Sequence, residues 1–421
     1  MIRTPHIRLL VSTLLAAAAF SPPAHSATEI APVEPPSRAS FATAAVTRGA
    51  ELAALGDCIV CHTAAHGPPY AGGRAVETPF GTVYSDNITP DPVTGVGTWS
   101  PAAFRRAMRD GIDRLGRHLY PVLPYPHFVH ATDDDLDALY AFLMTRQPVT
   151  RTTPPDDLPF PFSWRPLLAV WNALFLSGGV WQPDASQSTE WNRGAYLVDA
   201  VGHCGACHSP RNVLGAETGR AFSGGEAEGW YAPPLQSSSD APTPWTVDAL
   251  STYLRTGFDR GHGAASGPMT EVTHQLAAVP DGDVRAMAVY IASLMPQAPS
   301  NMATPPVPRP APDPAAEAMF QGSCGACHAT DAPMTRAGAP SLAFSTAVNE
   351  PSPRDVVHVI LQGLPWREGL AGPYMPGFAS ELTDEQVATL AAFVRARYTD
   401  KPAWSDIQAT VRDARKQGGG S

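Results

Sequence analysis

Cysteine is scarce in this chain, and none lies outside one short pattern. The six cysteines form three copies of Cys-x-x-Cys-His, at residues 58–62, 204–208 and 324–328. Disulfides, structural zinc and a thioredoxin-like pair are the alternatives to consider. Structural zinc takes four ligands, whereas each copy supplies three, and a thioredoxin-like pair requires no histidine after its second cysteine. The pattern is instead the attachment site of c-type haem.

Each copy gives its residues separate roles. The two thiols add to the haem vinyl groups as thioethers, and the adjacent histidine is the proximal axial ligand of the iron. We therefore predict three covalently bound haem c groups. The predicted attachment residues are Cys58, Cys61, Cys204, Cys207, Cys324 and Cys327, and the predicted proximal ligands are His62, His208 and His328.

Positive charge is also in short supply. The formal net charge is −10, and charged residues make up 16% of the chain, which disfavours phosphate binding and a nucleic-acid partner. The sequence offers no nucleophile triad, phosphate loop or paired carboxylate site. The glycine pairs at 72–73 and 224–225 lack the context of a dinucleotide fold and are read as turns. Electron transfer is therefore favoured over substrate chemistry.

Apolar runs long enough to span a bilayer are not evident. Two arginines precede a charge-free apolar stretch at 9–20, and residues 24–26 end in a small side chain. These features predict a secretory signal peptide over residues 1–26. Because c-type haem is attached outside the cytoplasm, we expect the protein in a bacterial periplasm.

What the chain does contain is an internal repeat. The histidine of the first motif is followed after 37 residues by Trp99 and after 49 residues by Gly111. The histidine of the second motif is followed at the same spacings by Trp245 and Gly257. Equal spacing at two positions indicates duplication of one structural unit.

Helical periodicity surrounds each motif. We expect a helix before each motif, over 46–55, 191–201 and 315–321, and short helices over 100–110 and 246–256. A final amphipathic helix opens at Thr132, Asp281 and Thr383, with apolar residues three and four apart. In each final helix an aromatic residue stands six positions after the first apolar one. The predicted fold is mainly α, with three tandem class I cytochrome c domains joined by proline-rich linkers.

Prolines, of which there are 45, mark the boundaries between these units. We expect a signal peptide (1–26), a first unit (40–147), a linker with an apolar segment (148–187), a second unit (188–296), a proline-rich linker (297–313), a third unit (314–400) and a tail (401–421). The second linker predicts a stiff tether, so the third unit could stand apart. Residues 166–183 carry no acidic or basic side chain, and burial between units and peripheral membrane contact both remain open for them.

The sixth iron ligands should lie before each final helix, where methionine is common. Met269 lies 61 residues after the second proximal histidine, and Met375 lies 47 residues after the third. The same count of 61 from the first proximal histidine reaches Leu123, which cannot bind iron. The candidates for the first haem are His130 and His127, then His118, Met108 and Met144, or an open site.

Longer stretches resemble a known family. Gly-Gly-Arg at 72–74 and Thr-Pro-Phe-Gly-Thr-Val-Tyr-Ser-Asp-Asn-Ile-Thr-Pro-Asp at 78–91 resemble the first domain of the three-haem cytochrome c subunits of membrane-bound periplasmic dehydrogenases. Trp-Asn-Arg-Gly-Ala-Tyr-Leu-Val at 191–198 and His-Cys-Gly-Ala-Cys-His-Ser-Pro-Arg at 203–211 resemble the same family. The resemblance covers nearly the whole chain after residue 26.

The resemblance implies an electron-transfer subunit. In that family a catalytic partner oxidises alcohols, sugars or gluconate, or aldehydes, and electrons leave to ubiquinone at the inner-membrane surface. Many members have methionine at the position of Leu123. This leucine, together with Gly-Gly-Glu-Ala-Glu-Gly-Trp-Tyr at 224–231, is most similar to subunits paired with molybdopterin aldehyde-type dehydrogenases, which implies a small iron–sulfur subunit as well.

Two rival functions remain. A five-coordinate first haem would allow a peroxidase-like haem enzyme. A tethering or maturation subunit of a terminal oxidase would carry an uncleaved spanning helix, and the sequence gives no convincing one. The leading prediction is an electron-transfer subunit that is periplasmic and peripherally attached to the inner membrane.

Overall fold

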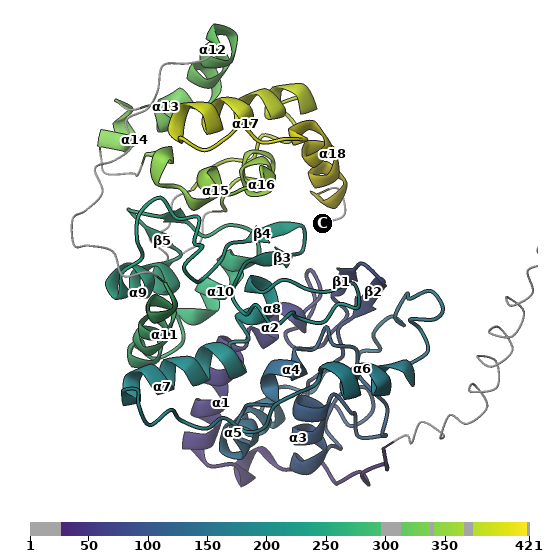
Figure 1. The fold of residues 1–421 in the computed structure, drawn as a ribbon. Coiled ribbons are helices and arrows are strands. Elements are labelled where there is room, and N and C mark those ends of the chain that lie inside the picture. The colour runs from purple at the N-terminus through teal and green to yellow at the C-terminus, as the bar shows by residue number, and fades with distance from the viewer. Residues whose placement is uncertain (1–26, 296–312, 330, 337–340, 366–373, 419–421) are drawn as a thin grey trace, which may run out of the picture.

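The computed structural model describes residues 27–295, 313–329, 331–336, 341–365 and 374–418 (Figure 1). The expected signal peptide and all of the proline-rich linker except residue 313 lie outside the described residues. The described chain is mainly helical, as the sequence predicts, and it contains three two-stranded antiparallel hairpins. No helix in these ranges is long and apolar enough to cross a membrane.

The first unit packs short helices around one hairpin. Its elements are η2 (Arg38–Ser40), α1 (Thr43–Leu55), α2 (Cys58–Cys61), β1 (Ala75–Thr78), β2 (Gly81–Tyr84), α3 (Pro101–Asp110), α4 (Tyr125–Phe128) and α5 (Asp133–Met144), followed by α6 (Leu167–Phe175). The hydroxyl of Ser100 accepts a hydrogen bond from the Ala103 N–H and begins α3, and Gly111 ends it with φ 61°. The hydroxyl of Thr132 accepts from the Asp135 N–H and begins α5.

The second unit repeats this arrangement. Its elements are α7 (Thr189–Tyr196), η3 (Leu197–Val201), α8 (Gly205–His208), β3 (Gly225–Ala227), β4 (Trp230–Ala232), α9 (Val247–Thr256), β5 (Phe258–Asp259), β6 (Gly263–Ala264), α10 (Pro268–Leu276) and α11 (Asp281–Leu294). The Thr246 hydroxyl caps α9, and Gly257 ends it with φ 71°. The equally spaced Gly111 and Gly257 therefore mark equivalent helix ends. The helix expected over 191–201 is α7 continued by a π-helical turn, η3.

The third unit keeps the first and last helices of the pattern and adds one in the tail. Its elements are α12 (Pro314–Ser323), α13 (Gly325–His328), α14 (Pro333–Arg336), η4 (Leu342–Phe344), α15 (Thr346–Asn349), α16 (Arg354–Gln362), α17 (Asp384–Tyr398) and α18 (Ile407–Gly418). Thr383 and Gln386 form a reciprocal capping box at the start of α17. The helix starts predicted at Thr132, Asp281 and Thr383 are thus confirmed.

In every unit the helix before the motif crosses the final helix. The pairs are α1 with α5, α7 with α11, and α12 with α17. A Cβ atom on Gly49 would lie 2.0 Å from the Ala138 carbonyl oxygen, and one on Gly194 would lie 1.9 Å from the Ala286 carbonyl oxygen. Glycine therefore lets the two helix backbones touch at the α1–α5 crossing and at the α7–α11 crossing. The repeated aromatic residue lies at the same place, since a Cβ on Gly49 would also lie 2.6 Å from the Phe142 Cβ.

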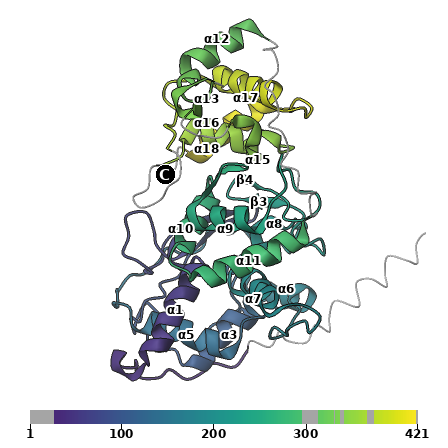
Figure 2. The same cartoon turned by 90° about the vertical axis from the view of Figure 1, so that its left-hand side faces the viewer.

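The first two units share one hydrophobic core, and the third has its own. Charge pairs also join the first two units, because the guanidinium of Arg48 contacts both Asp135 at 3.0 Å and Asp283 at 3.3 Å. Arg74 pairs with Glu228 at 2.8 Å in the same way. The units lie one above another, with the third at the top in both views (Figures 1 and 2).

The third unit does not stand apart, contrary to the expectation from its linker. The Tyr231 N–H in β4 donates a hydrogen bond of 2.8 Å to the carboxylate of Asp355 in α16. The ring of Trp230 stacks on His358, with centroids 4.6 Å apart. Arg354 pairs with Glu226 at 2.7 Å. The hairpin β3–β4 of the second unit thus packs against α16 of the third (Figure 2).

The apolar segment after the first unit forms α6, a helix that the sequence did not predict. One side of α6 is held on the first unit, since Asn172 accepts a hydrogen bond from the Tyr125 hydroxyl and donates one to the Asp110 carbonyl. The other side is open to solvent, with Val170 56% and Leu174 66% exposed. The segment is therefore not buried between units along its whole length.

Candidate haem-binding sites

Each Cys-x-x-Cys-His motif closes a single helical turn. The histidine N–H donates to the carbonyl of the first cysteine over 3.0 Å at His62, 3.0 Å at His208 and 2.9 Å at His328. Residues three apart on such a turn share a face, so the two thiols point to one side. All six cysteines are free of disulfides. Each turn can therefore present two thiols and an imidazole to one planar group.

Two of the predicted proximal histidines are held by a backbone carbonyl. Nδ1 of His62 donates to the Asp86 carbonyl at 2.7 Å, and Nδ1 of His208 donates to the Pro233 carbonyl at 2.7 Å. This bond places the proton on Nδ1 and leaves Nε2 with the lone pair that a metal needs. Burial lowers the pKa of both rings, and also that of His328, which favours the neutral ligand form. Sequence reasoning missed Asp86 and Pro233.

The thiols are not arranged for nucleophilic chemistry. Burial raises the pKa of Cys58 and of Cys204 to about 12, and that of Cys324 to about 11. Catalytic and redox-sensing cysteines need a lowered pKa. These thiols therefore suit covalent attachment of a group better than nucleophilic catalysis.

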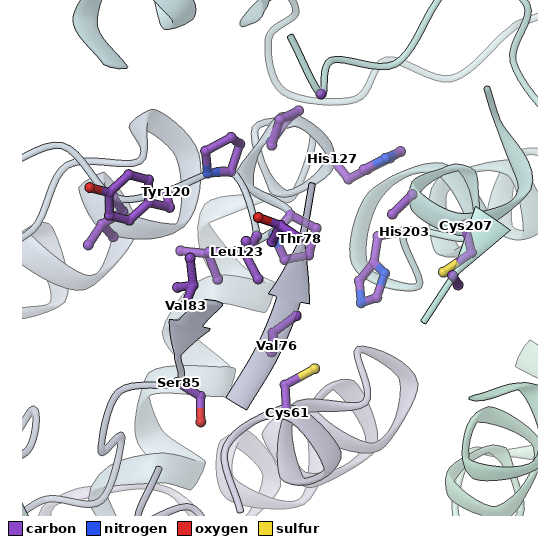
Figure 3. Close-up of a pocket in the computed structure, with 18 of the residues that line it drawn as sticks. Cys61, Val76, Thr78, Val83, Ser85, Tyr120, Leu123, His127, His203 and Cys207 are labelled. Atoms are coloured by element: carbon purple, nitrogen blue, oxygen red, sulfur yellow. The ribbon is translucent and has the colours of Figure 1, made fainter. Parts of the chain in front are cut away.

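An open cavity of about 3310 Å³ is lined by residues of all three units. Its wall includes Cys58, Cys61 and His62 of the first motif and Cys207 of the second. Cys61 and Cys207 are labelled in Figure 3. The volume exceeds that of pockets for ordinary small ligands, which is about 300–1,000 Å³. Apolar side chains from β1, β2, α3 and α5 line much of the first end: Val76, Val83, Phe104, Leu139 and Leu143. Together with the thiols and His62, this lining fits a porphyrin.

The first two motifs are close neighbours in space. Nε2 of His203, the residue before the second motif, lies 3.2 Å from the Gly56 carbonyl oxygen just before the first motif. A Cβ on Gly56 would lie 3.2 Å from the Val201 carbonyl oxygen, so the backbones are in contact there. The His203 ring meets Phe128 edge-on at 5.6 Å. Two groups attached at these motifs would therefore sit side by side.

His127, a candidate sixth ligand of the first haem, has both ring nitrogens engaged. Nδ1 donates to the Asp199 carbonyl at 2.9 Å, and Nε2 contacts the Glu217 carboxylate at 2.7 Å. Burial by itself would lower the pKa of His127, but the hydrogen bond and charge of Glu217 outweigh it and the pKa is raised. Both ring nitrogens therefore face oxygen atoms of the second unit, and binding a metal would require one of these contacts to break.

The other candidates lie in different surroundings. Nδ1 of His130 donates to the Gly179 carbonyl at 2.8 Å and holds the segment after α6. Burial lowers the pKa of His118, whose Nδ1 has no hydrogen-bond partner. Met144 is buried in α5, whereas Met108 lines the cavity from α3. Leu123 lines it too and faces the same space as Cys61 (Figure 3).

The two predicted methionine ligands occupy different kinds of position. Met269 lies in the first turn of α10 rather than in a loop, two residues after Gly267, which has φ 53°. Met375 pairs with Leu364 through two backbone hydrogen bonds of 2.8 and 3.0 Å. Both side chains are partly buried. Their roles as iron ligands remain predictions.

Comparison with known proteins agrees with this chemistry. Residues 311–394 match the family described as cytochrome C oxidase, cbb3-type, subunit III. The chain is 48% identical over 397 residues to a nicotinate dehydrogenase subunit of Pseudomonas putida, covering 93% of this chain and 33% of that one. It thus spans about a third of that relative's length.

Two relatives of similar length match along most of both chains. The gluconate 2-dehydrogenase cytochrome c subunit of Pantoea cypripedii is 37% identical over 384 residues, covering 84% of this chain and 86% of its own. The fructose dehydrogenase cytochrome subunit of Gluconobacter japonicus is 35% identical over 415 residues, covering 91% and 84%. With its Cys-x-x-Cys-His turns and carbonyl-bound histidines, the chain belongs to the family of cytochrome c subunits of dehydrogenases, and it is a covalent haem c protein of electron transfer.

Proposed function

We propose that this chain carries three haem c groups and conducts electrons out of a periplasmic dehydrogenase complex. In this proposal the chain has three tandem class I cytochrome c domains, with the unit boundaries expected from the sequence. The observation that carries it is the unit that recurs around each motif, a helix before the motif crossing a final helix. The haem supplies the one-electron redox step, and the protein positions the groups and sets their potentials.

The chain's own residues would do three things for conduction. The proximal rings of His62 and His208 are fixed by carbonyl bonds, which orients them toward an iron. Met269 and Met375 are the proposed sixth ligands of the second and third haems, and methionine ligation raises the potential. The contact of His203 with Gly56 brings the first two sites together, which favours transfer between them.

The proposed electron donor is a catalytic dehydrogenase subunit. An aldehyde-oxidising molybdopterin enzyme with a small iron–sulfur subunit is favoured, as Leu123 and residues 224–231 suggest, and alcohol or sugar dehydrogenases are the alternatives. The relatives are named as subunits of nicotinate, gluconate and fructose dehydrogenases, which supports a dehydrogenase partner in general. The proposed acceptor is ubiquinone.

The proposed location is the periplasmic surface of the inner membrane. Exposed apolar side chains gather on and just before α6, where Phe160 is 82%, Trp164 is 54% and Leu174 is 66% exposed. Apolar and Trp side chains of this kind suit an interfacial position. They support peripheral contact rather than a spanning segment.

Membrane contact is tested by washing membranes that contain the protein. We expect the wild-type chain to resist salt and to need detergent for release, whereas the Val170→Asp/Leu174→Asp double variant should be released by salt. Met334→Asp, at an exposed apolar side chain of the third unit, is the matched control and should behave as wild type. Complete release of the wild-type chain by salt would contradict membrane contact through α6.

The haem count and partner are tested on protein purified from native membranes. A pyridine haemochrome assay should give three haems per chain, and the Cys204→Ser/Cys207→Ser variant should give two, with the mass falling by one haem. Identification of the cofactor in the co-purified subunit then assigns the substrate class. Fewer than three haems in the wild-type protein would refute the proposal, as would a co-purified subunit with no redox cofactor.

A further inference from the structure

The first site differs from the second at one position of the repeat. Leu123 and Met269 both lie 61 residues after their proximal histidines. The side chain of Leu123 lines the cavity that Cys58, Cys61 and His62 also line. Leu123 and Cys61 are labelled in Figure 3. Because leucine has no lone pair, the site lacks the ligand that its repeat partner offers.

Of the three candidate histidines, His127 and His118 are unsuited to take its place. Both ring nitrogens of His127 are held, by the Asp199 carbonyl and by Glu217. His130 lines the cavity, and its Nδ1 donates to the Gly179 carbonyl, the kind of bond that leaves Nε2 with its lone pair, so an experiment must exclude this ring as the ligand. His118 stands between Arg117 and Leu119, which line the cavity, so in this extended stretch its side chain faces the other way.

The wall around Leu123 is instead apolar. Phe104 and Met108 come from one face of α3, four residues apart, and both are more than 90% buried. Leu139 and Leu143 come from one face of α5 in the same way. Met108 is part of this packed wall, on a helix rather than on a loop before a final helix. Its sulfur, like Nε2 of His130, is a candidate ligand that an experiment must exclude.

We propose that the haem iron attached at Cys58 and Cys61 has no sixth protein ligand and binds small neutral diatomic molecules, carbon monoxide or nitric oxide, when reduced. The ligand donates a lone pair to the ferrous iron, and no bond breaks and no electron is lost. The apolar side chains packed around Leu123 favour neutral ligands over anions, because they cannot compensate for the desolvation of a charge. The inference depends on the proposed attachment of haem to the first motif.

The test uses the full-length haem-loaded protein and carbon monoxide. Mass spectrometry first verifies a haem on the peptide that contains Cys58 and Cys61. After reduction, we expect one carbon monoxide per chain, read from the shift of the Soret band. The Leu123→Met variant should lose this binding, and its oxidised form should gain the near-infrared charge-transfer band of methionine-bound iron. Leu123→Ile is the matched control and should keep the binding.

The outcomes separate the inference from the function on which it rests. A missing haem at the first motif would refute the proposed three-haem function itself. A haem that is present but binds no carbon monoxide in the wild-type protein would overturn the inference alone. If Met108→Leu then gained carbon monoxide binding, Met108 would be the sixth ligand. Binding that persists unchanged in Leu123→Met would place it at another haem and would also overturn the inference.

Discussion

At the scale of single residues, the chemistry depends on contacts that side-chain identity does not reveal. The rings of His62 and His208 are held in the same way, although one carbonyl belongs to an aspartate and the other to a proline. The hydrogen bond needs only a backbone carbonyl oxygen, which every residue has. No sequence pattern therefore identifies the residues that hold the two histidine rings. The cysteines and histidines proposed to bind haem could be identified from the sequence because covalent attachment requires those residue types at a fixed spacing.

The proposed open site at Leu123 also predicts a redox property that can be measured. Methionine ligation favours ferrous iron, and axial ligands as a whole span roughly 0.8 V of haem potential. We expect Leu123→Met to raise the midpoint potential of one haem by on the order of 0.1 V, a modest part of that range. A spectroelectrochemical titration of the haem-loaded protein measures this, with Leu123→Ile as the control. A Leu123→Met variant whose haem potentials all match those of the wild-type protein would contradict the prediction.

At the scale of elements, the sequence predicted helices well and short strands poorly. The Ser100, Thr132 and Thr246 caps and the glycines at 111 and 257 carry local hydrogen-bond and backbone signals, and the structure confirms them. The hairpin strands span two to four residues each, too few for an alternating pattern to be seen. The helix α6 was missed because proline and paired glycines interrupt its neighbourhood, while contacts of Asn172 stabilise it.

The close crossing of α7 and α11 gives a prediction at this scale. A side chain on Gly194 would clash with the Ala286 backbone, which cannot move without separating the helices. We expect Gly194→Leu to lower the free energy of unfolding by at least about 3 kcal/mol and to impair haem attachment at the second motif. Chemical denaturation followed by circular dichroism measures the first effect and haem count the second.

A glycine on the partner helix supplies the control for this test. No heavy atom lies within 4 Å of a Cβ on Gly282, in the first turn of α11. Gly282→Ala should therefore leave stability unchanged or raise it by about 0.5–1 kcal/mol. Equal tolerance of both substitutions would mean that the crossing does not need the glycine.

At the scale of the whole molecule, the sequence misled on how the third unit sits. Eight prolines between 296 and 314 indicate a stiff tether, and a stiff tether permits docking as well as separation. The position of the third unit is instead determined by the surface where it meets the second. There the Trp230 ring stacks on His358, and the Tyr231 N–H donates a hydrogen bond to Asp355. Such a match between residues more than a hundred positions apart has no local signature in the chain.

The surface between the second and third units buries the carboxyl group of Asp355. Ionisation of this group should weaken the contact between the two units. Burial raises the pKa of Asp355 from its ordinary value of 3.8 to about 6, against the opposing effects of the Tyr231 N–H, Glu350 and Arg354. Burial also holds the pKa of neighbouring Glu350 well above its usual value, with the charge of Asp355 adding to this shift. Asp240, Arg395 and the phenols of Tyr231 and Tyr253 are further titratable groups near this pair. Protonated carboxyl groups are therefore favoured in the folded, docked state.

The sign of the pH dependence follows from these raised values. Because the folded state binds the proton of Asp355 more tightly than the unfolded state, its contribution to stability is complete below pH 3.8 and is lost as the pH rises through 6. We expect thermal unfolding of the third unit to shift to lower temperature between pH 4 and pH 7. Asp355→Asn, which keeps an oxygen for the Tyr231 N–H, should remove this contribution and gain up to about 3 kcal/mol at pH 7. Glu385→Gln, at an exposed carboxylate of α17, should change stability by less than about 0.5 kcal/mol at either pH. If Asp355→Asn and wild type lost stability equally between the two pH values, the carboxyl group of Asp355 would not control the docked surface.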